Sequence, residues 1–452
     1  MVKSKLPPNV FPPLQLSPSE MQAIVTYTDE LVAETLTASE KFIAHHRKFN
    51  PERWKYVKTQ DHLHVYRSRR RKSSTSVEPP QLLSLSEMSS GGSLASSDGV
   101  GASQSKSSGA NRSHRHDSDY LTDGSLLARA RPQRVPLLVV TGKMDGTVED
   151  AAFGAQADNE ARWRLRDAYI GDEYTDQKIL ATIKTPTVED PFRFLGVKWA
   201  TKVLGTFITQ RDMVYIESIG MARDSNGERV AYVLMHSYAL DRVPELSEFG
   251  VIRARVSSCF ILRPHSDRTV EVFCRAFNDM GGDMMDNVTI SIFTQTVLSV
   301  GGLVECAYVK KLKWQMTARE CEAREHATTL AAQAHSPTHC AACHHSLSKF
   351  ARMVQTGAAC QVCRRVFCGK CTVTKKVGVG FGNAGGITTK NMEFCQECFT
   401  LAMKLSAWSV ALETVSDGKP QMGSHNSLST TKSLSKSLSK SLSKSMSLSS
   451  SS

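Results

Sequence analysis

Eight of the twelve cysteines in this chain of 452 residues fall in four Cys-x-x-Cys pairs near its C-terminal end. The pairs are Cys340 with Cys343, Cys360 with Cys363, Cys368 with Cys371, and Cys395 with Cys398. This spacing lets two thiolates reach one ion at about 2.3 Å with tetrahedral geometry. Only four residues separate Cys363 from Cys368, which favours an interleaved arrangement. We therefore predict two zinc ions (Zn2+), one held by the first and third pairs and one by the second and fourth.

A framework of disulfides is the alternative for paired cysteines. The sequence starts with MVKSKLPPNVFPP, which is short, charged and rich in proline, so no secretory signal peptide is expected. In a chain that is not secreted, paired cysteines indicate metal binding more often than disulfides. Of the four cysteines outside the pairs, Cys259, Cys274 and Cys306 lie in apolar runs, where cysteine behaves as a small core residue.

Length and composition limit the class of protein. A chain of 452 residues predicts two or three domains, and 40% hydrophobic residues allow a sizeable core in part of it. No run approaches the ~20 apolar residues of a membrane span, so we expect no transmembrane segment and a cytoplasmic location. The net charge of +12 favours anionic partners, a lipid headgroup surface or nucleic acid, although the excess is spread over several segments.

The N-terminal part predicts a helix, two strands and a long insertion. Residues 19–46 have an amphipathic stripe, with Ser19 as the expected N-cap. Short strands are predicted at 54–57 and 63–66. Residues 67–134 are rich in Ser, Gly and Arg and carry too little apolar surface to offset chain entropy, so disorder is expected there.

The middle of the chain predicts an antiparallel sheet followed by a long helix. Four successive β-like runs are the strongest signal, at 212–219, 229–239, 251–264 and 269–278. Residues 284–325 are expected to be helical, with a kink or break at Gly301-Gly302. A long apolar helix packed on a curved sheet buries both apolar faces and closes a cavity between them.

The order of several short motifs in this part resembles START lipid-binding domains. The motifs are WKYVKTQDHLHVYRSR, RDMVYIES, VIRARVSSCFILRPH and VEVFCRAFNDMGGDMMDNVTISIF. The resemblance covers residues 16–318 apart from the insertion at 67–134. It implies an α+β helix-grip fold, in which a long C-terminal helix lies across a curved antiparallel sheet and the cavity holds one lipid.

Residues 335–402 resemble a FYVE zinc finger. The resemblance rests on the four cysteine pairs, on Phe350 between the first two, and on the sequence VFCGKC at 366–371. It implies a finger that binds phosphatidylinositol 3-phosphate on endosomal membranes. The basic run that reads this headgroup in the family is met here by TGAACQ at 356–361, and the arginine before the last pair is met by Glu393.

Four other basic residues stand near the predicted zinc sites and are our candidates for an anionic membrane contact: Arg364, Arg365, Lys375 and Lys376. The alternative is that these residues belong to an ordinary solvated surface. The remaining segments are an N-terminal tail at 1–15, a linker helix at 319–334 and a low-complexity tail at 403–452. The tail can begin with a short helix at 403–412 that carries Trp408, and it ends in a repeat of Ser-Leu-Ser-Lys.

No catalytic signature is found, so we expect no enzyme activity and no nucleic-acid partner. Three hypotheses remain. The first is a lipid-binding or lipid-transfer protein whose zinc finger places it at a membrane or a protein partner. The second is a scaffold or adaptor in which the cavity is closed and both modules bind proteins. The third is a RING-like ubiquitin ligase, although most RING fingers include histidine ligands.

Overall fold

The computed structural model of the chain describes residues 6–7, 9–69, 125–172, 174–205, 208–326, 338–347, 359–381 and 386–416. The backbone alone is described for 320–326, and the same holds for 381 and 416. The predicted tail beyond 416, most of the predicted insertion and Phe350 lie outside these residues.

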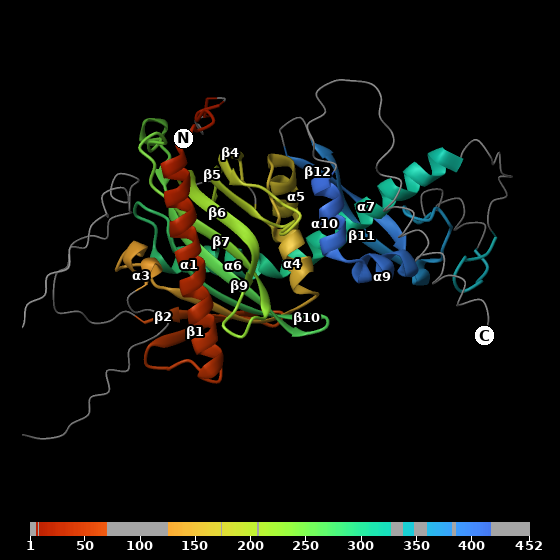
Figure 1. Ribbon diagram of the computed structural model, residues 1–452, viewed down its shortest axis with the longest axis horizontal. Helices are drawn as coiled ribbons and strands as arrows, with labels where there is room; N and C mark the ends of the chain where they lie inside the picture. The colour runs from red at the N-terminus through yellow and green to blue at the C-terminus, as the bar shows by residue number, and fades with distance from the viewer. Residues whose placement is uncertain are drawn as a thin grey trace, which may run out of the picture. The chain divides into compact units, whose positions relative to one another are not determined.

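A large antiparallel sheet forms the centre of the fold (Figure 1). Its strands are β1 (Trp54–Gln60), β2 (Leu63–Ser68), β3 (Leu138–Asp145), β4 (Asp176–Lys184), β5 (Phe194–Lys202), β6 (Arg211–Arg223), β7 (Arg229–Ser237), β9 (Arg255–Ser266) and β10 (Thr269–Asp279). They are ordered β1-β2-β3-β10-β9-β7-β6-β5-β4, and the short β8 (Ile252–Arg253) pairs with β6 in parallel. The four strongest β-like runs of the sequence correspond to β6, β7, β8–β9 and β10, with longer bounds for β6.

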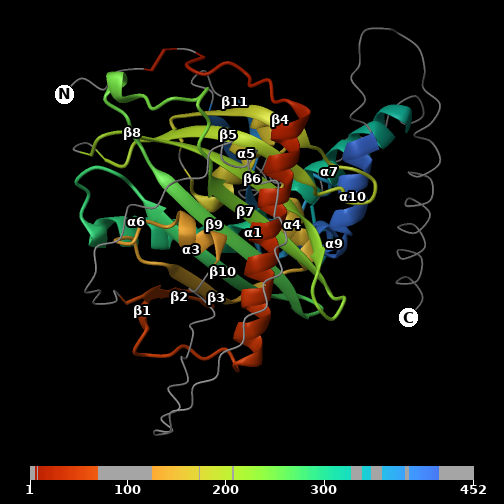
Figure 2. The same cartoon turned by 60° about the vertical axis from the view of Figure 1, so that its left-hand side comes forward.

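Both faces of the sheet are buried, and different helices cover them. Helix α1 (Pro18–Ala44) crosses one face (Figures 1 and 2). Helices α4 (Val148–Ala155), α6 (Asp286–Leu298) and α7 (Gly302–His326) cover the other face. On β9, Cys259 and Ile261 face α1, whereas Phe260 and Leu262 belong to the opposite core. Because side chains alternate along a strand, a strand that is apolar on both faces indicates this three-layer arrangement. The predicted α+β helix-grip fold is confirmed.

Helix α1 starts earlier than predicted, because Ser17 rather than Ser19 is its N-cap. The Ser17 hydroxyl accepts from the Glu20 amide at 3.2 Å, and the Glu20 carboxylate accepts from the Ser17 amide at 2.6 Å. Pro18 occupies the first helical position, where its missing N–H costs nothing. At the other end, positive φ values at His46 and Arg47 carry the chain out of the helix.

The predicted insertion is too long at both ends. Strand β2 continues to Ser68, and the fold resumes at Ser125 with α3 (Leu126–Ala130). Leu127 is 1% exposed in the α1-side core, and the Leu126 amide donates to the Glu34 carboxylate at 2.9 Å. The apolar pair at 126–127 is too short to stand out from its polar surroundings. Its burial depends on contact with α1, which is distant in sequence.

The predicted long helix contains the expected break. A 3-10 turn (η2, Ser299–Gly301) separates α6 from α7 at the Gly301-Gly302 pair. A buried ion pair between Lys311 and Asp150 ties α7 to α4. Gly154 of α4 has no room for a Cβ, which would lie 1.8 Å from the Leu303 carbonyl oxygen. This close approach fixes α7 over the sheet.

By length and composition alone, Asp286–Arg319 could cross a membrane. In the described structure this stretch is α6, η2 and α7, and Phe293, Val297 and Leu303 are buried in the core of the sheet domain. The core helix of a globular domain has the same composition, so the stretch is accounted for by this packing.

The cysteine-rich region forms a small module of its own elements. These are η3 (Gly369–Cys371), a hairpin of β11 (Thr372–Phe381) and β12 (Ile387–Cys395), and helix α9 (Gln396–Lys404). Residues 378–381, the first part of the glycine-rich run GVGFGNAGG, continue β11. In the segment predicted as a tail from 403, the short helix carrying Trp408 is present as α10 (Ala407–Ser416), which buries Ala407, Val410 and Ala411 against the sheet domain.

Candidate functional sites

A largely apolar cavity lies between the sheet and the helices that cover it on the side of α4, α6 and α7. It contains about 1000 Å³ of space free of atoms, part of which is open to solvent. Strands β6, β7, β9 and β10 supply one wall, including Met213, Val233 and Phe260. Helices α6 and α7 supply the other wall, including Val297 and Leu303.

The START resemblance includes residues 16–66 in the domain that encloses the cavity, but the structure does not place them in its lining. None of the described residues that line it comes from that range. Helix α1 packs on the opposite face of the sheet, against β9 and β10. The amphipathic stripe of α1 indicates that one side is buried, but it does not say which face of the sheet receives it.

One end of the cavity carries a buried cluster of charges. Arg166 donates to the Glu217 carboxylate at 2.8 Å, and Lys198 pairs with its other oxygen. All three side chains are at most 5% exposed. Burial alone would raise the pKa of Glu217, but the two cations hold it below its ordinary range. Burial likewise lowers the pKa of Lys198 to about 8.

Arg166 comes from α5 (Glu160–Ile170), which the sequence reasoning missed together with β5. Asn159 caps this helix by accepting from the Arg162 amide at 2.9 Å, and Gly171 ends it with φ +69°. This cap and C-terminal glycine are signals from which α5 could be found. The side chain of Asp167, next to Arg166, is also buried, and desolvation raises its pKa to about 8.

Another part of the lining, which we call the mouth, is formed by Asp172, Lys202, Leu204, Arg211 and Met280. Lys202 and Arg211 are direct cross-strand partners on β5 and β6, so both point to the same face of the sheet. Lys202 pairs with Asp172 at 3.1 Å. Arg211, which is 5% exposed, donates instead to the carbonyl oxygens of Thr209, Met280 and Gly281.

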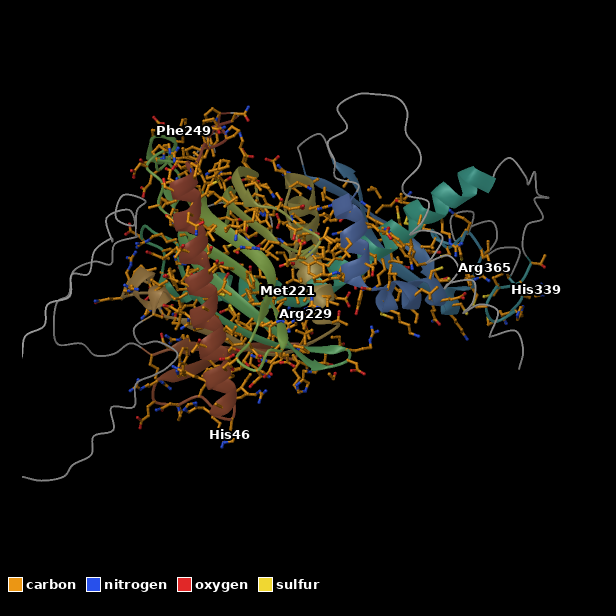
Figure 3. All side chains as sticks on the ribbon, in the orientation of Figure 1. His46, Met221, Arg229, Phe249, His339 and Arg365 are labelled. Carbon is orange, nitrogen blue, oxygen red and sulfur yellow. The ribbon has the colours of Figure 1, made fainter. Side chains whose placement is uncertain are left out.

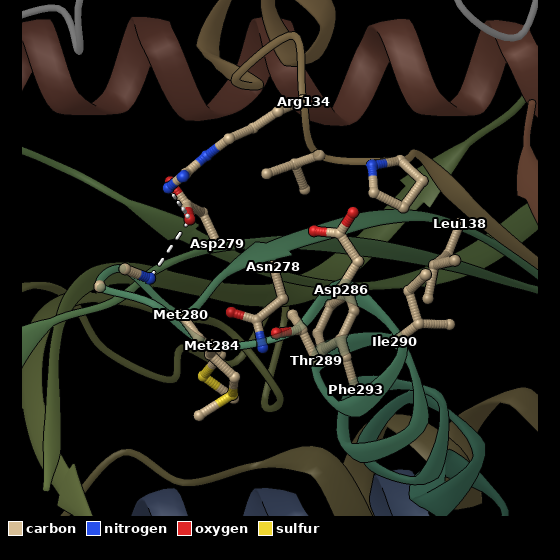
Figure 4. Close-up of a pocket in the computed structure, with 14 residues that line it drawn as sticks. Arg134, Leu138, Asn278, Asp279, Met280, Met284, Asp286, Thr289, Ile290 and Phe293 are labelled. Carbon is tan, nitrogen blue, oxygen red and sulfur yellow. Dashed lines mark hydrogen bonds and ion pairs between the residues drawn. The ribbon is translucent and has the colours of Figure 1, made fainter. Parts of the chain in front are cut away.

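A second, more polar pocket adjoins the cavity and shares Asn278, Met280 and Phe293 with it (Figure 4). Asp279 in this pocket accepts from Arg134 at 3.1 Å and from Arg255 at 2.8 Å. It also accepts from the Gly281 amide at 3.2 Å, which supports the turn before α6. These contacts give Asp279 a structural role.

The structure brings the eight paired cysteines together in two groups. Cys340, Cys343, Cys368 and Cys371 form one group, and Cys360, Cys363, Cys395 and Cys398 form the other. Within each group all sulfur atoms lie within 4.8 Å of one another. Four thiolates around an ion at 2.3 Å would be about 3.8 Å apart. The sulfurs of Cys343 and Cys368 are 3.6 Å apart, and those of Cys363 and Cys395 are 4.0 Å apart. Each group could therefore hold one metal ion.

The first two pairs have the same backbone geometry. His344 and Arg364 directly follow their pairs and have φ values of +56° and +61°. The amides of these two residues donate to the carbonyl oxygens of Cys340 and Cys360 at 3.0 and 2.9 Å. Each turn thus carries its two sulfurs to one side. His344 is exposed on such a turn and belongs to neither cysteine group, as expected for a loop residue.

The four basic residues of the predicted membrane contact are in different environments. Arg364 and Lys376 are exposed. Arg365, labelled in Figure 3, pairs with Glu397 at 2.9 Å. Lys375 pairs with Glu305 of α7 at 3.0 Å and lies over the Phe399 ring, with its side chain 19% exposed. Lys375 thus joins the module to α7.

Comparisons with known proteins give similarities in structure alone. No family model matches the chain, and no curated protein matches its sequence. Human STARD10 is 7% identical, over 64% of this chain and 83% of that one, with a TM-score of 0.34. Human StAR-related lipid transfer protein 5 is 13% identical, over 61% and 96%, also with a TM-score of 0.34. Norcoclaurine synthase from Thalictrum flavum is 11% identical, over 38% and 94%, with a TM-score of 0.22. The fold assignment therefore rests on the sheet and helices described above.

Proposed function

We propose that this chain is a non-enzymatic lipid-binding or lipid-transfer protein of the START type, with a FYVE-related finger that holds two zinc ions. The observation that carries this proposal is the largely apolar cavity between the sheet and the C-terminal helices. Methionine, valine and phenylalanine side chains along its walls suit acyl chains or a sterol ring. The buried charges of Arg166 and Glu217 at one end suit a polar group of the ligand.

Native mass spectrometry of the purified full chain tests lipid binding. We expect one lipid to copurify with each chain. Val233→Trp, which fills the cavity wall, should abolish this adduct. Val188→Trp adds the same bulk at a position that is 66% exposed and should keep the adduct. A folded protein that takes up no lipid from vesicles of mixed cellular lipids would contradict the proposal and favour the adaptor hypothesis.

Zinc is the ion that best suits the two cysteine groups. Four thiolates in tetrahedral arrangement are typical of structural zinc sites, whereas oxygen ligands suit calcium and magnesium. Each group lacks an open position, which supports a structural role. Elemental analysis of the folded, reduced protein is expected to give two zinc ions per chain, and less than one would contradict this assignment.

We propose that the finger contributes membrane or partner contact without strong selectivity for phosphatidylinositol 3-phosphate. Support comes from the absence of the family's basic run at 356–361 and from the internal ion pairs of Arg365 and Lys375. Charge-assisted bonds contribute about 1.5–3 kcal/mol each, so the loss of several weakens headgroup binding by orders of magnitude. Vesicle sedimentation of the full chain should give weak binding that falls with salt. Tight, salt-resistant binding selective for the 3-phosphate would contradict this.

A further inference from the structure

The mouth of the cavity contains two cations that face each other without enough negative charge to match them. Lys202 on β5 and Arg211 on β6 are directly opposite in the antiparallel ladder. Like charges in this position destabilise a sheet. Among the described residues that line the mouth, Asp172 is the carboxylate available, and it pairs with Lys202.

The Arg211 guanidinium is held by carbonyl oxygens and has no carboxylate partner among the described residues. Its guanidinium donates to the Met280 and Gly281 carbonyl oxygens at 3.1 and 3.3 Å, and among the described residues it forms no ion pair. Burial lowers its pKa, and no neighbouring carboxylate offsets that effect. Charged groups this deeply buried are normally paired with an opposite charge.

The buried cluster around Glu217, which also borders this cavity, has carboxylates that match its cations. There Arg166 and Lys198 share the Glu217 carboxylate, and Asp167 lies 3.7 Å from Arg166. Arg166 and Lys198 already have carboxylate partners, so a further anion would gain little beside them. At the mouth, Lys202 is partly exposed, with 22% of its side chain accessible.

Building on the proposed function, we infer that Lys202 and Arg211 bind the phosphate of an anionic lipid whose acyl chains occupy the cavity. The planar guanidinium and the ammonium group would approach the phosphate from two neighbouring strands. The apolar walls beyond them would take the chains, with Met213 next to Arg211 on the same face of β6. Arg211 would exchange its carbonyl contacts in the 280–281 turn for the phosphate oxygens.

Two lipids that differ in the phosphate alone test this inference. Phosphatidic acid and diacylglycerol with the same oleoyl chains are offered to the full chain in phosphatidylcholine vesicles, and the bound lipid is measured by native mass spectrometry after the vesicles are removed. We expect the wild-type chain to prefer phosphatidic acid by about tenfold or more. Arg211→Gln and Lys202→Gln should each remove most of that preference while uptake of diacylglycerol is kept.

Two basic residues on strands β6 and β4, which do not line the cavity, serve as matched control positions. Arg223 on β6 also donates to a carbonyl oxygen, that of Gly227, and is exposed. Lys184 at the end of β4 is exposed as well. Arg223→Gln and Lys184→Gln change the net charge equally and should leave the preference unchanged. Arg211→Lys, which keeps the charge, should retain a larger part of the preference than Arg211→Gln.

The outcomes separate this inference from the proposed function. Equal uptake of both lipids by the wild-type chain would overturn the phosphate site but not the proposed lipid binding. The same holds if Arg211→Gln loses both lipids equally and Lys202→Gln has no effect. Uptake of neither lipid, nor of any other class, would contradict the proposed function itself. Inorganic phosphate alone should stabilise the chain weakly in a thermal shift assay. Strong stabilisation by inorganic phosphate without uptake of phosphatidic acid would overturn the lipid as the source of the phosphate.

Discussion

The sheet domain and the cysteine module are stabilised by different means. The sheet domain buries two extensive apolar cores, one on each face of its sheet. The core of the module is small, and about half of its fully buried members are cysteines or residues of α7 such as Val309 and Leu312. Small units rarely bury enough apolar surface to fold alone, and metal ions commonly supply the missing stability. We therefore expect the module to depend on metal ions in its two cysteine groups and on α7, and the sheet domain to depend on neither ion.

Helix α7 connects the two regions because its sides belong to different cores. Val304 and Ala307 pack in the sheet domain, and Val309 and Leu312 pack in the module. The Tyr169 hydroxyl donates to the Lys376 carbonyl oxygen, and Lys313 donates to the Gly378 carbonyl oxygen at 3.0 Å. Farther along, Trp408 of α10 meets Phe192 edge to face at 5.4 Å and lies under Arg229. The module is thus anchored on a helix that also covers the cavity.

The largest expected effect is loss of a cysteine ligand. Cys368→Ser should remove one metal ion and unfold the module, because binding of a structural zinc contributes about 10–16 kcal/mol in small zinc modules. Elemental analysis and limited proteolysis of residues 338–404 measure this. The sheet domain should keep its own cooperative melting transition. Cys259→Ala, a buried cysteine of β9 outside both groups, should keep both ions. A protease-resistant module in Cys368→Ser would contradict the predicted dependence on metal.

The next effect concerns the buried charges of the sheet domain. Glu217→Gln leaves Arg166 and Lys198 buried without their carboxylate and should destabilise the chain by about 3–5 kcal/mol. Chemical denaturation of the metal-loaded protein measures the change. Glu228→Gln removes a carboxylate that is 43% exposed and should cost less than about 1 kcal/mol. If both variants cost the same, the buried cluster contributes no more than a surface ion pair does.

The two regions also differ in how much of them could be predicted. The grouping of the cysteines follows from ligand chemistry and from the short separation of Cys363 and Cys368, which are local features. Alternating or doubly apolar runs likewise predicted β6, β7, β9 and β10. Strand β5 was missed because its fully buried run includes Lys198, which is polar in sequence and buried only because Glu217 lies beside it. Helix α5 was missed for the same reason, since its buried face includes Arg166 and Asp167. Pairing between distant charges leaves no local pattern.

A smaller, pH-dependent effect is expected on the α1 side of the sheet. His236 is buried between the Tyr27 hydroxyl at 3.0 Å and the Ser257 hydroxyl at 2.8 Å, and burial lowers its pKa to about 4. The folded chain keeps this ring neutral, whereas the unfolded chain protonates it below about pH 6.5. The neutral His236 ring therefore makes its full contribution to the free energy of unfolding above pH 6.5. This contribution is lost as the pH falls toward 4, by about 3 kcal/mol in total. His236→Gln should flatten this part of the stability curve, and the exposed His62→Gln should not. If the free energy of unfolding of His236→Gln falls with pH as steeply as that of the wild-type chain, groups other than His236 cause this pH dependence.

The smallest change in stability should come from deletions within the insertion. Such deletions locate the boundary between the insertion and the folded chain. Deletion of 73–120 removes none of the described core, so the melting temperature should change little. Leu127→Ala, by contrast, creates a cavity in the α1-side core, where the leucine is 1% exposed, and should cost about 2–5 kcal/mol. Extending the deletion to 130 removes Leu126, Leu127 and Ala130 together and should cost at least as much. Thermal melts of the three proteins decide between the boundaries. A large loss on deletion of 73–120 would mean that the insertion stabilises the fold, whereas no loss on extension to 130 would mean that α3 contributes nothing despite its burial.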